Sequence, residues 1–137
     1  MITNLSAVFP AIVETLNGSS FNFHLTGSRF FGGVKVESDW DFFVEESEEV
    51  IQFLNSIGFE KDFEASYDDP SVIAVYYGYC MHQDRSVKVD VQLVGNAELK
   101  LEVQRILQQC WPCGMSHFDK QSVRAIWKAA LEVAAQK

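Results

Sequence analysis

The chain has 137 residues, of which 47% are hydrophobic and 22% charged, and its formal net charge at pH 7 is −8. This length and apolar content suffice for one hydrophobic core, so we expect a single domain over residues 1–137. The acidic balance disfavours sequence-independent binding to nucleic acid, because such binding depends on Lys and Arg side chains that neutralise phosphates.

An amphipathic helix is expected near the N-terminus. Apolar residues recur there with helical spacing, at Leu5, Val8, Phe9, Ile12, Val13 and Leu16, and Asn17-Gly18 ends the pattern. Pro10 would interrupt a longer helix, because proline removes a backbone hydrogen bond and clashes with the preceding turn. We therefore expect regular helix from about Val8, with its apolar side in the core.

A strand followed by a glycine turn comes next. Phe21, Phe23 and Leu25 alternate in a β-favouring run that stops at Gly27-Ser28. Glycine adopts backbone angles closed to other residues, and a helix opening at Ser28 would present unpaired N–H groups and the positive end of its dipole to an anion. Taken alone, the pair is also what an ordinary turn with a helix cap requires. A phosphate chain would fit the same place.

Two aspartates mark the following strand. Successive side chains of a strand point to opposite faces, so Asp39 and Asp41 share one face. The other face carries the apolar Trp40, Phe42 and Val44. Carboxylates this close raise each other's pKa unless a cation lies between them, and a divalent metal ion is suited to that place.

The middle of the chain predicts a helix and a hairpin. Glu45, Glu46, Glu48 and Glu49 precede the apolar Val50, Ile51, Phe53, Leu54 and Ile57, as expected for a helix whose positive N-terminal dipole is stabilised by acids. A metal-binding role for Glu45 or Glu46 is the alternative interpretation. Residues 60–71 are expected to form a surface loop that can hold a short strand near Phe63. After it, the β-branched and aromatic run 72–80 and the alternating run 86–94 predict an antiparallel hairpin.

The second strand of this hairpin supplies a third carboxylate. Val87, Val89, Val91 and Leu93 alternate with Lys88, Asp90 and Gln92, so Asp90 lies on the open face of a half-buried strand. If this strand lies beside the Asp39/Asp41 strand, the three carboxylates converge. Such an arrangement is typical of two-metal phosphoryl transfer, in which one metal activates the attacking oxygen and the other holds the leaving phosphates.

Gly27-Ser28, a spacer, Asp39-x-Asp41 and a lone Asp90 in a later strand together resemble the signature of the polymerase-beta-type nucleotidyltransferase superfamily, and the short chain resembles its minimal, single-domain members. The similarity covers roughly residues 21–94. It departs from many members at Phe30-Phe31, where smaller residues are common, and this concerns the shape of the pocket near the phosphates.

The resemblance implies roles for particular residues. Gly27 and Ser28 would hold the phosphates of a nucleoside triphosphate, and Arg29 would assist them. Asp39 and Asp41 would bind two Mg²⁺ ions, and Asp90 would bind the metal ion that activates the acceptor hydroxyl. The implied fold is α/β (α+β), with a small mixed β-sheet and helices packed on one side.

The C-terminal third predicts two helices. Leu99, Val103, Ile106 and Leu107 lie on one side of the first, which ends at Trp111-Pro112. Asp119 is suited to cap the second, whose expected inward residues are Val123, Ile126, Trp127, Ala130 and Ala134. Lys120, Arg124 and Lys128 form a basic stripe, which is either a solvated face or a surface that meets the triphosphate or an acidic acceptor.

Cys110-Trp-Pro-Cys113 resembles a thioredoxin-type CxxC motif and, with His117, one half of a zinc site. However, a second ligand pair at zinc-site spacing and the strand-helix context of a redox motif are both absent from the sequence. Reduced, packed thiols are the simpler interpretation, and an odd cysteine count agrees with a reducing compartment. No apolar run approaches the roughly 18–20 residues of a membrane span, and no signal peptide is recognisable. We therefore expect a cytoplasmic protein without a membrane partner.

The sequence therefore predicts a magnesium-dependent nucleotidyltransferase that moves a nucleoside monophosphate, most commonly AMP in this superfamily, to an acceptor hydroxyl. We rank a protein or small-molecule acceptor above nucleic acid because the chain is acidic. The alternative is a non-catalytic module of the same fold that binds a nucleotide or a partner; loss of a carboxylate would indicate it, and all three are present. A purely structural acidic protein is a third possibility.

Overall fold

The fold is a small α+β arrangement built on one mixed sheet. The computed structural model describes residues 11–27, 39–64, 71–82, 84–110 and 120–135. Its elements, in chain order, are α1 (Ala11–Asn17), β1 (His24–Thr26), β2 (Trp40–Glu45), α3 (Glu48–Ser56), β3 (Glu60–Lys61), β4 (Val72–His82), β5 (Arg85–Val94), α4 (Ala97–Cys110) and α5 (Lys120–Ala135).

The five strands lie in the order β1-β2-β5-β4-β3. β2 and β5 are parallel neighbours at the centre, whereas β1 pairs with β2, β4 with β5, and β3 with β4 in antiparallel fashion. The predicted hairpin is confirmed as β4 and β5, and Asp84 takes a left-handed φ of 63° in its turn. The expectation that the Asp90 strand lies beside the Asp41 strand is likewise confirmed.

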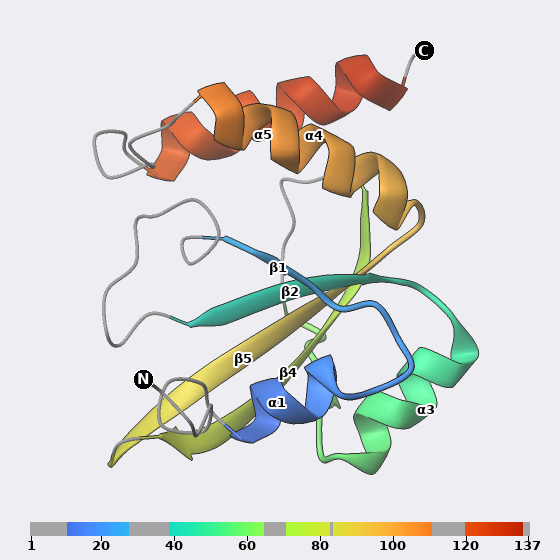
Figure 1. The fold of residues 1–137 in the computed structure, drawn as a ribbon, viewed down its shortest axis with the longest axis vertical. Coiled ribbons are helices and arrows are strands. Elements are labelled where there is room, and N and C mark those ends of the chain that lie inside the picture. The colour runs from blue at the N-terminus through green and yellow to red at the C-terminus, as the bar shows by residue number, and fades with distance from the viewer. Residues whose placement is uncertain (1–10, 28–38, 65–70, 83, 111–119, 136–137) are drawn as a thin grey trace.

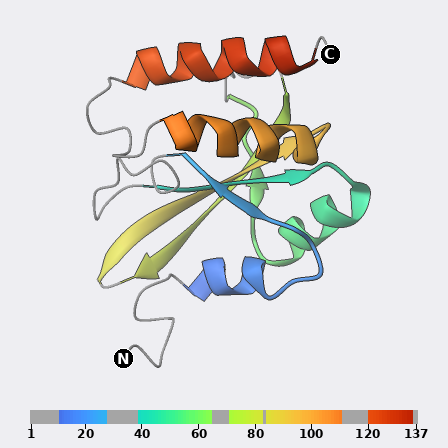
Figure 2. The same ribbon diagram turned by 45° about the horizontal axis from the view of Figure 1, so that its top comes forward.

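Helices cover both faces of the sheet (Figures 1 and 2). On one side, called the α3 face here, α1 and α3 pack against the alternate residues of the central strands. Its core contains Val13, Leu16, Trp40, Phe42, Val44, Val50, Leu54, Val89, Val91 and Leu93. On the other side, called the α4 face, Phe43 and Val94 pack against Ala97 and Leu101 of α4.

The prediction of helices on one side of the sheet is therefore wrong. By alternation along β2, Phe43 projects on the same face as Asp41. Phe43 is 0% exposed, because α4 crosses that face and covers it. A central strand neighbouring a parallel strand is commonly buried on both sides, and a continuous apolar run is its usual sequence pattern.

Local signals explain where α3 begins and ends. The Ser47 hydroxyl accepts a hydrogen bond from the Val50 N–H, and Glu48 and Glu49 occupy the first turn, where acids stabilise the helix dipole. Gly58, with a φ of +93°, follows the last turn in a conformation that costs little only for glycine. The predicted helix with acids at its start is confirmed.

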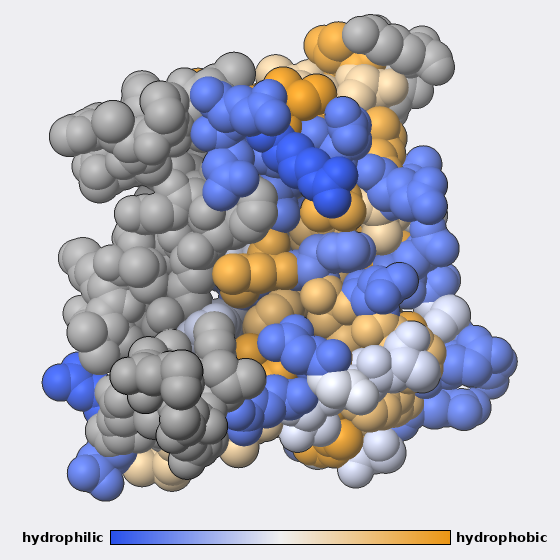
Figure 3. Space-filling view, viewed as in Figure 1, coloured by the Kyte–Doolittle hydropathy of each residue, from blue (hydrophilic) through white to orange (hydrophobic). Residues whose placement is uncertain are grey.

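α5 packs on α4 and forms a layer above the sheet. Val103, Leu107 and Leu131 are buried between the two helices, and Trp127 is partly buried with them. Ile106 and Ile126 were expected to face inward, but they are 51% and 42% exposed. On the side shown in Figure 3, hydrophilic side chains lie over α4 and near α3, with hydrophobic ones between them.

No helix within the described ranges is long and apolar enough to cross a membrane. The expected helix near the N-terminus is described from Ala11 onward, where Val13 and Leu16 are buried as predicted. The positions Leu5, Val8 and Phe9 lie outside the described residues.

Candidate functional site

The end of β1 is pressed against the first residues of β2. Thr26 is the register partner of Asp41, and Gly27 follows with a φ of +71°. A Cβ atom added to Gly27 would lie 2.5 Å from Oδ2 of Asp41, closer than real contacts allow. Both its backbone angle and the carboxylate beside it therefore favour glycine at position 27.

Asp41 and Asp90 are register partners on adjacent parallel strands. Each alternates with residues of the α3 face, so both side chains project on the α4 face, and both are partly buried. Asp39 is exposed and directly precedes β2. The structure therefore brings Asp41 and Asp90 side by side next to Gly27, with Asp39 at the margin of the pair.

Asp90 lies in a partly desolvated setting, close to other acidic residues of the described part of the chain. Burial raises the pKa of the Asp90 carboxyl above its ordinary value, and the charges of Asp39 and Asp62 raise it further. Lys88 opposes this rise, with its Nζ 3.5 Å from Oδ1 of Asp90. Lys88 offsets only part of this rise, and a second cation placed beside Asp90 would further favour its charged form.

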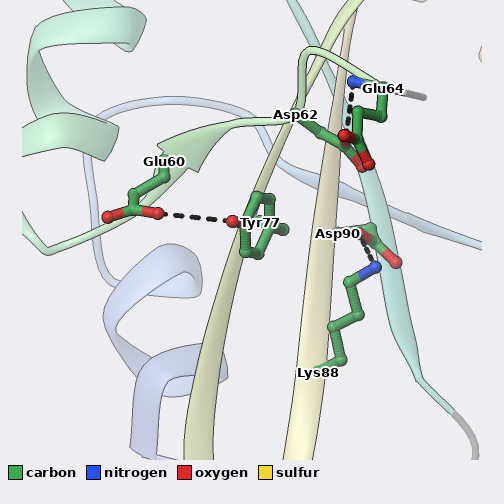
Figure 4. A network of polar contacts seen from close by, with 6 residues as sticks. All are labelled: Glu60, Asp62, Glu64, Tyr77, Lys88 and Asp90. Atoms are coloured by element: carbon green, nitrogen blue, oxygen red, sulfur yellow. Dashed lines mark hydrogen bonds and ion pairs between the residues drawn. The ribbon is translucent and has the colours of Figure 1, made fainter.

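Lys88 and Asp90 lie in a network that reaches β3 and β4 (Figure 4). The Lys88 ammonium lies 5.5 Å from the centre of the Tyr77 ring. The Tyr77 hydroxyl donates a hydrogen bond to Oε2 of Glu60 at 3.3 Å, and the charge of Glu60 raises the pKa of Tyr77. Asp62 accepts a hydrogen bond from the backbone N–H of Glu64 at 3.0 Å. The rim of the site on this side is therefore acidic and aromatic.

Two polar side chains of α4 are buried against the same face. Lys100 is 2% exposed; it donates a hydrogen bond to Oε1 of Gln92 at 2.8 Å and lies over the Phe43 ring. Gln104 is 1% exposed and donates to the carbonyl of Leu25 at 2.9 Å, while its Oε1 has no hydrogen-bond partner among the described residues. Sequence reasoning missed both, although their spacing from Ala97 and Leu107 put polar residues on the apolar stripe of α4.

A groove of about 510 Å³ runs along β1 between α1 and α4. His24 and Arg105 line it together with Trp40 and Phe42, whose chain neighbour is Asp41. Burial lowers the pKa of His24, and the charge of Arg105 lowers it further. The volume lies in the range of pockets that hold small molecules.

Carboxylates are suitable ligands for Mg²⁺, but those of the described residues do not form a complete coordination shell. Among residues 11–27, 39–64, 71–82, 84–110 and 120–135, no three His, Cys, Asp or Glu side chains form a group that could hold a metal ion. Mg²⁺ is usually bound by one or two carboxylates together with water and substrate phosphates. Asp41 and Asp90 supply two carboxylates in a negatively charged setting, so they fit a cation that shares its remaining positions with a bound phosphate.

Several predicted residues lie outside the described part of the chain. Ser28 and Arg29, expected to hold phosphates, are among them, as is Cys113. Cys80 is a partly buried free thiol whose pKa is raised by burial. Lys128 is exposed, as either interpretation of the basic stripe requires.

Comparisons with protein-family models, with curated proteins and with solved structures found no match.

Proposed function

We propose that this chain is a magnesium-dependent nucleotidyltransferase of the polymerase-beta type. It would move a nucleoside monophosphate, AMP in the superfamily's commonest case, from a triphosphate to an acceptor hydroxyl and release pyrophosphate. One observation carries the proposal: Asp41 lies in register with Asp90 on the neighbouring strand while the backbone of Gly27 abuts its carboxylate. Residues far apart in the sequence thereby meet at one place.

This arrangement suggests a role for each residue of the site. Gly27 has no side chain, so phosphates can approach the backbone of the turn. Asp41 and Asp90 would hold the magnesium ions together with Asp39 at the margin. When bound, the ions neutralise charge on the phosphates and the leaving pyrophosphate. The protein contributes mainly positioning and preorganised charge.

The groove along β1 is a suitable place for the nucleoside part of the donor. It is lined by His24 and Leu25 of β1, and this strand leads directly into Gly27, so a base held there would leave its phosphates near Gly27.

A protein or small-molecule acceptor ranks above nucleic acid. The chain carries a net charge of −8, and the exposed residues Glu60 and Glu64 add acid to the rim of the site. A phosphate backbone would be repelled there, whereas a neutral or basic acceptor would not.

The deciding experiment is a thermal melt with each of the four ribonucleoside triphosphates, with and without Mg²⁺. A ligand present at about 100 times its dissociation constant stabilises by roughly 2.7 kcal/mol, which moves the midpoint by several degrees. We expect one triphosphate to stabilise the wild type only with Mg²⁺, and Asp41→Asn to lose this response and its transfer activity while staying folded.

Asp84→Asn is the matched control, because it removes the same charge from the exposed hairpin turn, where Asn tolerates the left-handed φ. It should respond as the wild type does. Transfer by Asp41→Asn at the wild-type rate would contradict the proposal. Stabilisation by a triphosphate without any transfer would instead favour the non-catalytic binding module.

A further inference from the structure

Lys88 occupies an unusual position at the candidate site. It stands two residues before Asp90 on β5, so both side chains project on the same face. Its Nζ is 3.5 Å from Oδ1 of Asp90 and 5.5 Å from the centre of the Tyr77 ring. The negative charge of Asp39 also acts on it. Lys88 is therefore a cation already placed among the carboxylates.

This placement differs from that of Lys100 and Lys61, which also lie over aromatic rings. Lys100, on α4, is 2% exposed, and its ammonium lies over the rings of Phe43 and Trp127. Lys61 lies 5.4 Å from the centre of the exposed Phe63 ring, away from the paired aspartates. The Lys88 side chain is 31% exposed, so it can leave Asp90 for solvent without unpacking a core.

A divalent cation at Asp90 and the Lys88 ammonium would compete for the same oxygen. At 3.5 Å the ammonium lies where a cation on that carboxylate would meet a like charge at close range. Like charges so placed cost free energy unless one of them moves away, and the flexible four-carbon stem of lysine permits that movement.

We propose that Lys88 is a built-in counter-ion of the site. It pairs with Asp90 in the cation-free protein and is displaced when a divalent cation binds. Lys88 thereby lowers the affinity of the site for divalent cations. This inference rests on the proposed function, because it assumes that Asp90 takes part in cation binding. Lys88 is a positioning residue here and makes no contact with the reacting atoms.

The test measures Mn²⁺ binding to the full chain without nucleotide, from the electron paramagnetic resonance signal of free Mn²⁺ at low ionic strength. We expect Lys88→Met to bind Mn²⁺ roughly tenfold more tightly than the wild type, because an adjacent positive charge has been removed. Lys88→Arg keeps the charge and should stay within about threefold of the wild type. Lys61→Met removes a lysine elsewhere and should leave the affinity unchanged.

A double-mutant cycle with Asp90→Asn tests whether Lys88 acts on cation binding through the Asp90 carboxylate. The gain from Lys88→Met should vanish when Asp90 is already Asn. Equal or weaker Mn²⁺ binding by Lys88→Met would overturn the inference while leaving the cation site intact. Absence of any Mn²⁺ binding that Asp90→Asn or Asp41→Asn weakens would overturn both the inference and the proposed metal site. Melting curves without metal show whether each variant is folded.

Discussion

β2 and β5 carry different kinds of residue on their two faces. On the α3 face, Phe42 and Val91 are 2% and 0% exposed and belong to one continuous apolar cluster. On the α4 face the strands carry Asp41 and Asp90 at one end and Phe43, covered by α4, at the other. On this second face the carboxylates of Asp41 and Asp90 stay partly accessible.

The residues that stabilise the fold therefore differ from the residues that form the candidate site. Burial of apolar area on the α3 face is the main favourable term in folding. The α4 face instead keeps a partly desolvated carboxylate with a raised pKa, an arrangement that opposes folding and is common at functional sites. Substitutions on the two faces should therefore change different measurements.

Truncation on the α3 face should give the largest loss of stability. Phe42→Ala removes a ring that is 2% exposed and stacked beside Trp40, with ring centres 6.4 Å apart. We expect the free energy of unfolding to fall by about 3–5 kcal/mol, from lost burial and the cavity left behind. Denaturant unfolding measures it. Phe63→Ala, at an 84% exposed ring, is the control and should change little. A loss below about 1 kcal/mol for Phe42→Ala would contradict the two-face description.

The sequence predicted the α3 face well because its pattern is local. Strict alternation over residues 86–94 indicates which side chains enter the core, and it places Asp90 on the opposite face. The pairing of β2 with β5 could only be assumed from the sequence, because the paired residues are some fifty positions apart and no local pattern relates them.

The α4 face was predicted less well because its burial depends on a helix from elsewhere in the chain. The run Trp40–Glu45 does not reveal that Phe43 lies under α4. Lys100 and Gln104 look like solvated residues until Phe43, Gln92 and Leu25 are seen beside them. The sequence does place Lys88 on the face of Asp90, but the 3.5 Å approach follows only from the folded geometry.

Gly27→Ala should have the next largest effect, and it should act on the site. The added methyl group would meet Asp41 at 2.5 Å in a backbone conformation, φ +71°, that disfavours alanine. We expect a loss of about 1–3 kcal/mol of stability and loss of the Mg²⁺-dependent response to triphosphate, measured by thermal melts.

Gly58→Ala separates the two causes. Gly58 has a similar φ of +93°, but an added Cβ there would meet nothing within 4 Å. This variant should show the backbone cost alone and keep the response to triphosphate. If the two variants respond to ligand in the same way, the contact between Gly27 and Asp41 has no bearing on the site.

Asp90→Asn should have the smallest effect on stability and the opposite sign. Because folding raises the Asp90 pKa above 3.8, the folded state binds its proton more tightly than the unfolded chain does. That contribution is favourable below about pH 3.8 and is lost as the pH rises through the folded-state pKa, so at pH 7 the ionised carboxylate opposes folding. Without metal, Asn should therefore raise the free energy of unfolding at pH 7, by about 0.5–2 kcal/mol, while abolishing transfer. The gain should disappear under acid conditions where both states are protonated, and Asp84→Asn should show no such gain at pH 7. If metal-free Asp90→Asn melts below the wild type at pH 7, Asp90 stabilises the sheet. That result would contradict the conclusion that the α3 face provides stability while the α4 face carries the candidate site.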